Sequence, residues 1–163
     1  MTPKFRDNFL VINCVPLTED TLPQVPLAMF TIKGQCRCSR CDIKATHVAT
    51  YYEKSDPLRQ IVTNLFCQLP SGGMRMMTTD HILPRNLGGT NFPTNKQPMC
   101  SHCNMRKGHF ITDQELELVK SDPTRYLHLD PRKGRITRRK WKNLFTVAPD
   151  LKPVLETIVA RYA

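Results

Sequence analysis

The sequence predicts an α+β fold, with strands in the first half of the chain and helices in its last third. Three observations predict it. Short apolar, β-prone runs bounded by turn residues dominate the part before residue 82. Helix-start signals and apolar residues at helical spacing follow after residue 111. Two C-x-x-C pairs, at 38–41 and 100–103, mark turns that can hold a metal ion. The length of 163 residues favours one compact core.

Four strands are expected before residue 82. Residues 9–15 are an apolar run, and residues 28–33 lead towards the first cysteine pair. Residues 46–52 are rich in β-branched and aromatic side chains, which fit a pleated surface. A glycine turn at 71–73 precedes a strand over 74–80.

One helix is expected between these strands. Asp56 is a good N-cap residue, and Pro57 suits the first helical position because the missing amide is not needed there. The spacing that follows predicts a helix over 57–67. Its apolar residues are Leu58, Ile61, Val62, Leu65 and Phe66.

Further helices are expected in the last third of the chain. Thr112 and Glu115 form a capping-box pattern that opens a helix to about Ser121. Asp122-Pro123 starts another short helical turn, and Asp150 is expected to cap a last amphipathic helix. The apolar face of that helix consists of Leu151, Val154, Leu155, Ile158, Val159 and Tyr162.

The chain is strongly basic, with a formal charge of +10 from 24 Lys and Arg against 14 Asp and Glu. This excess favours a polyanionic partner, chiefly nucleic acid. No run approaches the roughly 20 apolar residues of a membrane span. The apolar run at 9–15 is too short for a signal-peptide core. We therefore expect a cytoplasmic protein with no membrane partner, in a bacterial or phage-infected cell.

Seven cysteines are present, and two C-x-x-C pairs account for four of them. In a cytoplasmic chain such pairs are more often zinc ligands than disulfides, although one pair alone could also be a redox motif. Two pairs can close one tetrahedral site. The expected structural zinc ligands are Cys38, Cys41, Cys100 and Cys103; Cys36, His47 and His102 are possible substitutes.

A dense run of reactive residue types lies between residues 80 and 108. It begins Asp80-His81-Ile-Leu-Pro and continues through Gly88-Gly89 and Asn95 to Cys-Ser-His-Cys-Asn104-Met-Arg-Lys-Gly. Hydrolysis of a phosphodiester needs an activated water and a metal that polarises the phosphate. A neutral imidazole suits the base role, and carboxylate and amide oxygens suit Mg²⁺ or Mn²⁺.

This ordered run resembles the motif of the HNH endonucleases. The resemblance extends over residues 38–108 at most, and it implies a ββα-metal (His-Me finger) nuclease core with a zinc knuckle. The patterns outside that range are expected to add N-terminal strands and C-terminal helices to this core. It implies that His81 is the general base and that Asp80 binds the catalytic Mg²⁺ or Mn²⁺. Asn95 is implied to fix His81 by bonding backbone across the loop.

The third motif position departs from the family, where histidine is common. Here it is Asn104, which can still ligate through its carbonyl oxygen and which favours an oxygen-preferring metal over zinc or nickel. Loss of catalysis is the rival explanation.

Basic residues near the motif and beyond it are the expected nucleic-acid contacts. Arg85, Arg106 and Lys107 lie in the motif, and Lys107 is expected near phosphate at a helix start. The strongest charge run lies further on and would give salt-dependent DNA binding, or else a merely solvated helix face. Its cations are Arg132, Lys133, Arg135, Arg138, Arg139, Lys140 and Lys142. Trp141 within it packs on the core or stacks on a base.

These features predict a metal-dependent DNA endonuclease that nicks or cuts duplex or branched DNA. Its size resembles phage or mobile-element nucleases, and an oligomer is possible. The expected division is an N-terminal extension over 1–35, a zinc-clamped nuclease core over 36–110 and a basic helical extension over 111–163. A non-catalytic zinc module that binds DNA or protein, and an RNA-cleaving nuclease of the same fold, are the alternatives.

Overall fold

The computed structural model describes residues 4–21, 37–129 and 134–161, with the side chains of the last range described from Arg139 onward. Contacts divide the chain into two compact units. The first consists of residues 1–80 and 97–106, and the second of residues 81–96 and 107–163. Each unit is described by itself.

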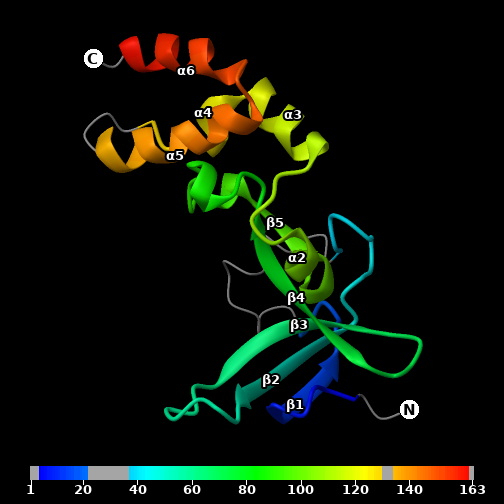
Figure 1. The fold of residues 1–163 in the computed structure, drawn as a ribbon. Coiled ribbons are helices and arrows are strands. Elements are labelled where there is room, and N and C mark those ends of the chain that lie inside the picture. Colours follow the sequence, from blue (N-terminus) through cyan, green and yellow to red (C-terminus); the bar gives the residue numbers. More distant parts are fainter. Residues whose placement is uncertain (1–3, 22–36, 130–133, 162–163) are drawn as a thin grey trace. The chain divides into compact units, whose positions relative to one another are not determined.

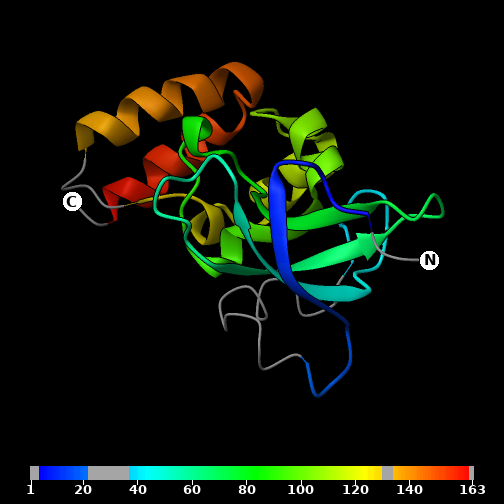
Figure 2. The same ribbon diagram turned by 90° about the horizontal axis from the view of Figure 1, so that it is seen from below.

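The first unit is built on an antiparallel sheet. Its strands follow the chain in order: β1 (Phe9–Pro16), β2 (His47–Glu53), β3 (Val62–Gln68), β4 (Met74–His81) and β5 (Lys96–Cys100) (Figure 1). Residue Phe66 pairs with His47 on one side and with Met76 on the other, which fixes the register of the central strand. The curved β1–β3 portion of the sheet is seen from a second direction in Figure 2.

Two apolar clusters stabilise this sheet. One consists of Phe66, Tyr51 and the ring of Phe5, which stack edge to face with Phe66 at the centre. The other packs Val48, Leu65 and Met77 against the paired cysteines. Three of the four paired cysteines, Cys38, Cys100 and Cys103, therefore belong to the core of the unit.

Three of the expected strands are confirmed. The strands over 9–15, 46–52 and 74–80 correspond to β1, β2 and β4. The strand expected over 28–33 lies outside the described residues. The class, α+β, is also confirmed.

The helix expected over 57–67 is wrong, because this segment is a turn followed by β3. Asp56 does cap backbone amides, but it accepts from Leu58 and Gln60 within a tight turn between β2 and β3. Leu58 and Ile61, which were expected on the buried helix face, are 74% and 67% exposed. The β-branched run that begins at Ile61 then continues as a strand.

The second unit is helical. It contains the 3-10 turns η2 (Arg85–Leu87) and η3 (Pro93–Asn95), then α3 (Asp113–Ser121), α4 (Pro123–Tyr126), α5 (Gly134–Val147) and α6 (Leu151–Ala160). The short helix α2 (Ser101–Lys107) follows β5 and belongs mostly to the first unit. The core of the second unit consists of Leu83, Leu87, Val119, Tyr126, Leu127, Leu144, Ala148, Leu151 and Leu155.

The helices expected in this region are confirmed, but one cap is wrong. Thr112 and Glu115 form the expected capping box at the start of α3. Asp150 precedes α6 yet makes no side-chain cap. Its carboxylate lies 2.9 Å from the ammonium of Lys120 on α3, which lowers the pKa of Asp150. The tertiary ion pair has replaced the local cap.

No helix in the described ranges is both long and apolar enough to cross a membrane. The three-part division of the chain at residues 35 and 110 stays a prediction.

Candidate active site and metal centre

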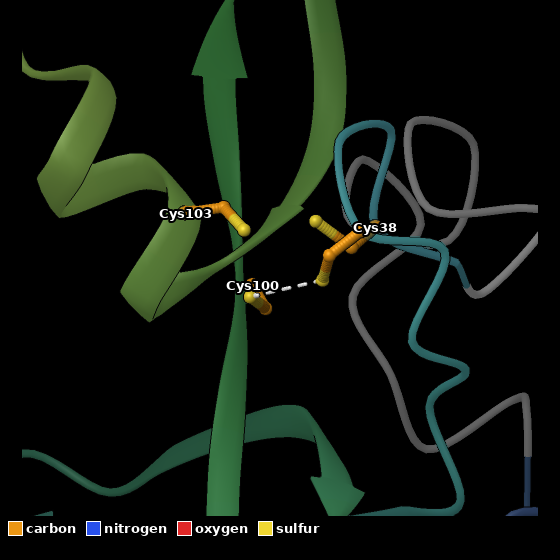
Figure 3. Close-up of side chains that lie close together, drawn as sticks. Cys38, Cys100 and Cys103 are labelled. Carbon is orange, nitrogen blue, oxygen red and sulfur yellow. Dashed lines mark hydrogen bonds between the residues drawn. The ribbon is translucent and has the colours of Figure 1, made fainter.

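Four cysteine sulfurs gather at one place in the first unit. The Sγ atoms of Cys38, Cys41, Cys100 and Cys103 all lie within 4.8 Å of one another. Figure 3 shows the side chains of Cys38, Cys100 and Cys103 pointing towards one another, from a loop, the end of β5 and helix α2. Cys38, Cys100 and Cys103 are buried, and Cys41 is exposed. The two pairs therefore form one site, as the spacing predicts.

Backbone hydrogen bonds hold this cluster in place. The amide of Asp42 donates to the carbonyl of Cys38, which closes the turn that carries the first pair. Asp42 adopts a positive φ of 56° in that turn. The amide of Ser39 donates to the carbonyl of Pro98 on β5, at 2.9 Å. Because β5 ends at Cys100, this bond joins the first cysteine pair to the second.

The spacing of the sulfurs fits zinc. Zn–S bonds of about 2.3 Å in a tetrahedron place neighbouring sulfurs about 3.8 Å apart. The Sγ atoms of Cys41 and Cys100 lie 3.8 Å apart. His47 hydrogen-bonds Thr46, and the exposed His102 is not part of the group. Cys36 lies outside the described residues.

The thiols influence one another's ionisation. Burial acts to raise the pKa of Cys38, but hydrogen bonds from the backbone amides of Cys100, Cys41 and Arg40 lower it to about 7. Burial raises the pKa of Cys41 and of Cys103, and hydrogen bonds with the neighbouring thiols raise that of Cys103 further. Adjacent thiolates repel, so a cation among them is what lets all four ionise. Cation binding must therefore displace protons from this site.

Two candidate ligands for a catalytic metal lie in the first unit. Asp80 is only 7% exposed and accepts a hydrogen bond from Nε2 of Gln97 at 3.0 Å. Asn104 directly follows Cys103 on α2, and its Nδ2 donates to the hydroxyl of Thr78 on β4 at 2.9 Å. That contact uses the nitrogen of the side-chain amide, and Oδ1 is the atom with the chemistry of a hard ligand. A carboxylate and an amide oxygen are hard donors and fit Mg²⁺ or Mn²⁺.

His81 is half-buried at the end of β4 and belongs to the second unit. Its Nε2 lies 2.9 Å from Oδ1 of Asn91. Its backbone carbonyl accepts a hydrogen bond from Nζ of Lys107 at 2.7 Å. The side chain and the backbone of His81 are thus both held.

Asn95 organises the loop between β4 and β5. It is fully buried, its Oδ1 accepts from the amide of Leu83, and its Nδ2 donates to the carbonyls of Leu83 and Thr90. Its own backbone carbonyl accepts from the amide of Ile82, the residue after His81. A Cβ at Gly89 would overlap the carbonyl oxygen of Leu83 and lie 2.8 Å from Nδ2 of Asn95. Only glycine leaves room for this amide.

Lys107 corrects an expectation about DNA contacts. The residue is 2% exposed, and Nζ lies 2.8 Å from Oε1 of Glu115 in addition to its bond with His81. An ammonium that is buried and ion-paired is not presented to a phosphate. Lys107 therefore holds the end of β4 and is not an exposed contact for nucleic acid.

The remaining basic residues are distributed over both units. Arg85 and Arg106 are exposed, as are Arg139 and Lys142 on α5, while Lys140 is half-buried. The side chains of Arg132, Lys133, Arg135 and Arg138 lie outside the described part of the structure.

Helix α5 is fastened to the loop that follows His81. Nδ2 of Asn143 donates to the carbonyl of Asn86 in η2, at 3.3 Å. A Cβ at Gly88 would lie 3.1 Å from the ring of Trp141, so the indole packs against this turn. Trp141 is half-buried against the core of the second unit, as the core-packing alternative expects.

Comparison with protein-family models finds a match over residues 65–117 to the family described as HNH endonuclease. The matched segment contains the order strand, strand, helix, formed by β4, β5 and α2, as expected for the ββα-metal core. It also contains the second cysteine pair, whereas Cys38 and Cys41 precede it. Comparison with curated proteins and with solved structures finds no match to the chain.

Several residues that support the HNH segment were not expected from the sequence. Asn91 contacts the imidazole of His81, Glu115 pairs with Lys107, and Thr78 contacts Asn104. Asn91 lies among turn-forming residues, which favour asparagine for local reasons. Glu115 was assigned to the capping box alone, and a capping glutamate with a buried lysine partner has no sequence signature.

We expect the protein to carry about one zinc ion per chain, held by four thiolates. Acidification should release it, because protons compete for the same sulfurs as the pH falls. Elemental analysis after dialysis at a series of pH values measures this. Cys100→Ser should lower the zinc content and the stability, while Cys14→Ser, outside the cluster, should retain zinc. A folded, stable protein free of zinc at neutral pH would contradict the assignment.

Asn95→Ala should lower the free energy of unfolding by about 3 kcal/mol, because it removes three buried hydrogen bonds and leaves their backbone partners unsatisfied. Urea unfolding followed by the fluorescence of Trp141, the single tryptophan, measures the change within the same unit. Asn86→Ala, at an exposed position of the same loop, is the control. Equal stability of the two variants would show that the Asn95 amide is dispensable.

Proposed function

We propose that this protein is a metal-dependent DNA endonuclease that hydrolyses phosphodiester bonds. One observation carries the proposal. Within a segment that matches HNH endonucleases, the Asp80-His81 pair is supplied with separate supporting contacts for each member. We assign His81 as the general base, Asp80 and Asn104 as ligands of the catalytic metal, and Asn95 as the residue that fixes the loop.

The base role of His81 rests on its setting. The imidazole is half-buried and held on one edge by Asn91, which leaves the other ring nitrogen to take a proton from water. Lys107 donates a hydrogen bond to the carbonyl of His81, and the carbonyl of Asn95 accepts one from the amide of the next residue, Ile82. The ring is thus positioned before substrate arrives, which is what proton transfer in a transition state requires.

Asp80 and Asn104 are proposed to hold Mg²⁺ or Mn²⁺. A metal held there would polarise the phosphate and stabilise charge on the leaving oxygen. Gln97 orients the carboxylate of Asp80, and Thr78 orients the amide of Asn104. These two hydrogen bonds fix the orientation of both side chains, in the manner of outer-shell partners at other metal sites.

The four-cysteine site is proposed to bind zinc in a structural role. Four thiolates complete the tetrahedron and leave no position for water or substrate. The proposed hydrolysis therefore takes place at Asp80, His81 and Asn104, and not at the cysteines.

Duplex or branched DNA is the proposed substrate. The net charge of +10 favours a polyanion. Arg139 and Lys142 are exposed on α5, which is attached to the Arg85–Gly88 turn through Asn143. Binding by such residues releases counterions, so affinity should fall steeply with salt. RNA cleavage, or DNA binding without cleavage, are the other outcomes of the test.

His81→Ala should reduce cleavage by about 100-fold or more, because the base is lost while the fold is kept. A plasmid-nicking assay with Mg²⁺, with Mn²⁺ and with chelator measures the rate, and a filter-binding assay measures DNA affinity, which should change little. Matched RNA and DNA substrates identify the nucleic acid. Cleavage by the variant at the parental rate would remove His81 from the base role.

Asn104→Ala should raise the concentration of Mg²⁺ or Mn²⁺ needed for activity, because an oxygen ligand is removed. Asn104→Asp should keep much of the activity, since it retains oxygen at the same reach. Asn104→His should shift preference towards Ni²⁺, Co²⁺ or Zn²⁺, which imidazole suits better. Activity is measured against metal concentration for the three variants. Parental metal dependence in Asn104→Ala would show that Asn104 is not a ligand.

A further inference from the structure

We propose that Asn91 is a positioning residue for catalysis, which holds the imidazole of His81 with the proton on Nε2. This inference rests on the proposed function, because it deepens the role given there to His81. Asn91 is distinct from Asn95, which acts on the backbone of the loop, and from Asn104 on α2. It touches the imidazole itself.

The contact determines which nitrogen can accept a proton. Nε2 of His81 lies 2.9 Å from Oδ1 of Asn91, and an amide oxygen only accepts hydrogen bonds. Nε2 therefore carries the hydrogen in the neutral ring, and Nδ1 keeps its lone pair. The reverse arrangement, with the Asn91 nitrogen donating to Nε2, would place the proton on Nδ1. Neither ring nitrogen could then take a proton from water, so base catalysis requires the arrangement seen here.

Both partners of the contact stand on fixed backbone. Thr90, the residue before Asn91, is 2% exposed; its carbonyl accepts from Asn95 and its amide donates to the carbonyl of Tyr126. On the other side, the carbonyl of His81 accepts from Lys107. The side-chain amide of Asn91 thus contacts the imidazole from a loop whose backbone is held by hydrogen bonds. Its own side chain is exposed, so the core does not require an asparagine at this position.

The test compares Asn91→Leu with Asn91→Asp. Leucine is similar in size but accepts no hydrogen bond, whereas aspartate keeps an oxygen acceptor at the same place. Asn86→Leu and Asn86→Asp, at an exposed position of the same loop, control for loss of an amide and for added negative charge. We expect kcat to fall about 10- to 100-fold in Asn91→Leu, with KM changed little, and to be largely retained in Asn91→Asp.

A spectroscopic measurement on the unliganded protein separates this inference from the proposed function. Long-range ¹H–¹⁵N correlation spectra above the titration range of imidazole distinguish the protonated from the unprotonated ring nitrogen, and His81→Ala assigns the signals. The parent and Asn91→Asp should show one tautomer, with the proton on Nε2. Asn91→Leu should show shifts averaged towards those of a free histidine.

Two results would overturn the inference. One is a parent protein with the proton on Nδ1. The other is an Asn91→Leu variant with the parental spectrum and the parental kcat. If the expected tautomer pattern is found but no nucleic acid is cut with Mg²⁺ or Mn²⁺, the contact assignment is supported and the proposed nuclease function fails.

Discussion

The loop that presents His81 depends on one buried side-chain amide. Asn95 bonds both backbone groups of Leu83 and the carbonyl of Thr90, so all three polar atoms are paired although none reaches water. Leaving any of them unpaired would cost about 1–3 kcal/mol, which makes this arrangement of the loop strongly preferred. Gly89 is part of the same constraint, since a side chain there would overlap Leu83 and press on the amide. The middle asparagine of the motif therefore acts on the proposed base through hydrogen bonds to the backbone of the loop.

A buried ion pair provides the second support. Lys107 and Glu115 are 2% and 6% exposed, and burial of two charges is tolerated only when further hydrogen bonds satisfy them. Lys107 donates to the carbonyl of His81, and the other oxygen of Glu115 accepts from the amide of Thr112. The carboxylate of Glu115 thus completes the capping box of α3 and also neutralises the ammonium of Lys107, which holds the end of β4. Removal of either partner would leave an uncompensated buried charge beside the proposed base.

The sequence predicted the features that short-range chemistry determines and missed those set by distant partners. The capping box and the cysteine cluster follow from fixed spacings, and both are found. The helix expected over 57–67 failed because Asp56 and Pro57 also suit a tight turn, and the choice between turn and helix lies in pairing with β2 and β4. Asp150 pairs with Lys120 and does not cap α6, and Lys107 pairs with Glu115 and is not exposed to phosphate. In both cases the partner is fixed only by the tertiary fold.

The proposed structural and catalytic metal sites of the first unit are linked by neighbouring residues in the chain and by two hydrogen bonds of Thr78. Cys103 and Asn104 are consecutive on α2, and Cys100 directly follows Met99. The hydroxyl of Thr78 accepts from Asn104 and donates to the carbonyl of Met99, at 2.9 and 2.8 Å. A cation bound by the cysteines would hold Cys100 and Cys103 at once. It would thereby fix Met99 and Asn104, the two residues that Thr78 contacts. The position of the Asn104 oxygen, a proposed ligand of the catalytic metal, then depends on the zinc bound by the cysteines. On this assignment the structural zinc serves catalysis by fixing the start of α2, and it takes no part in the chemical step.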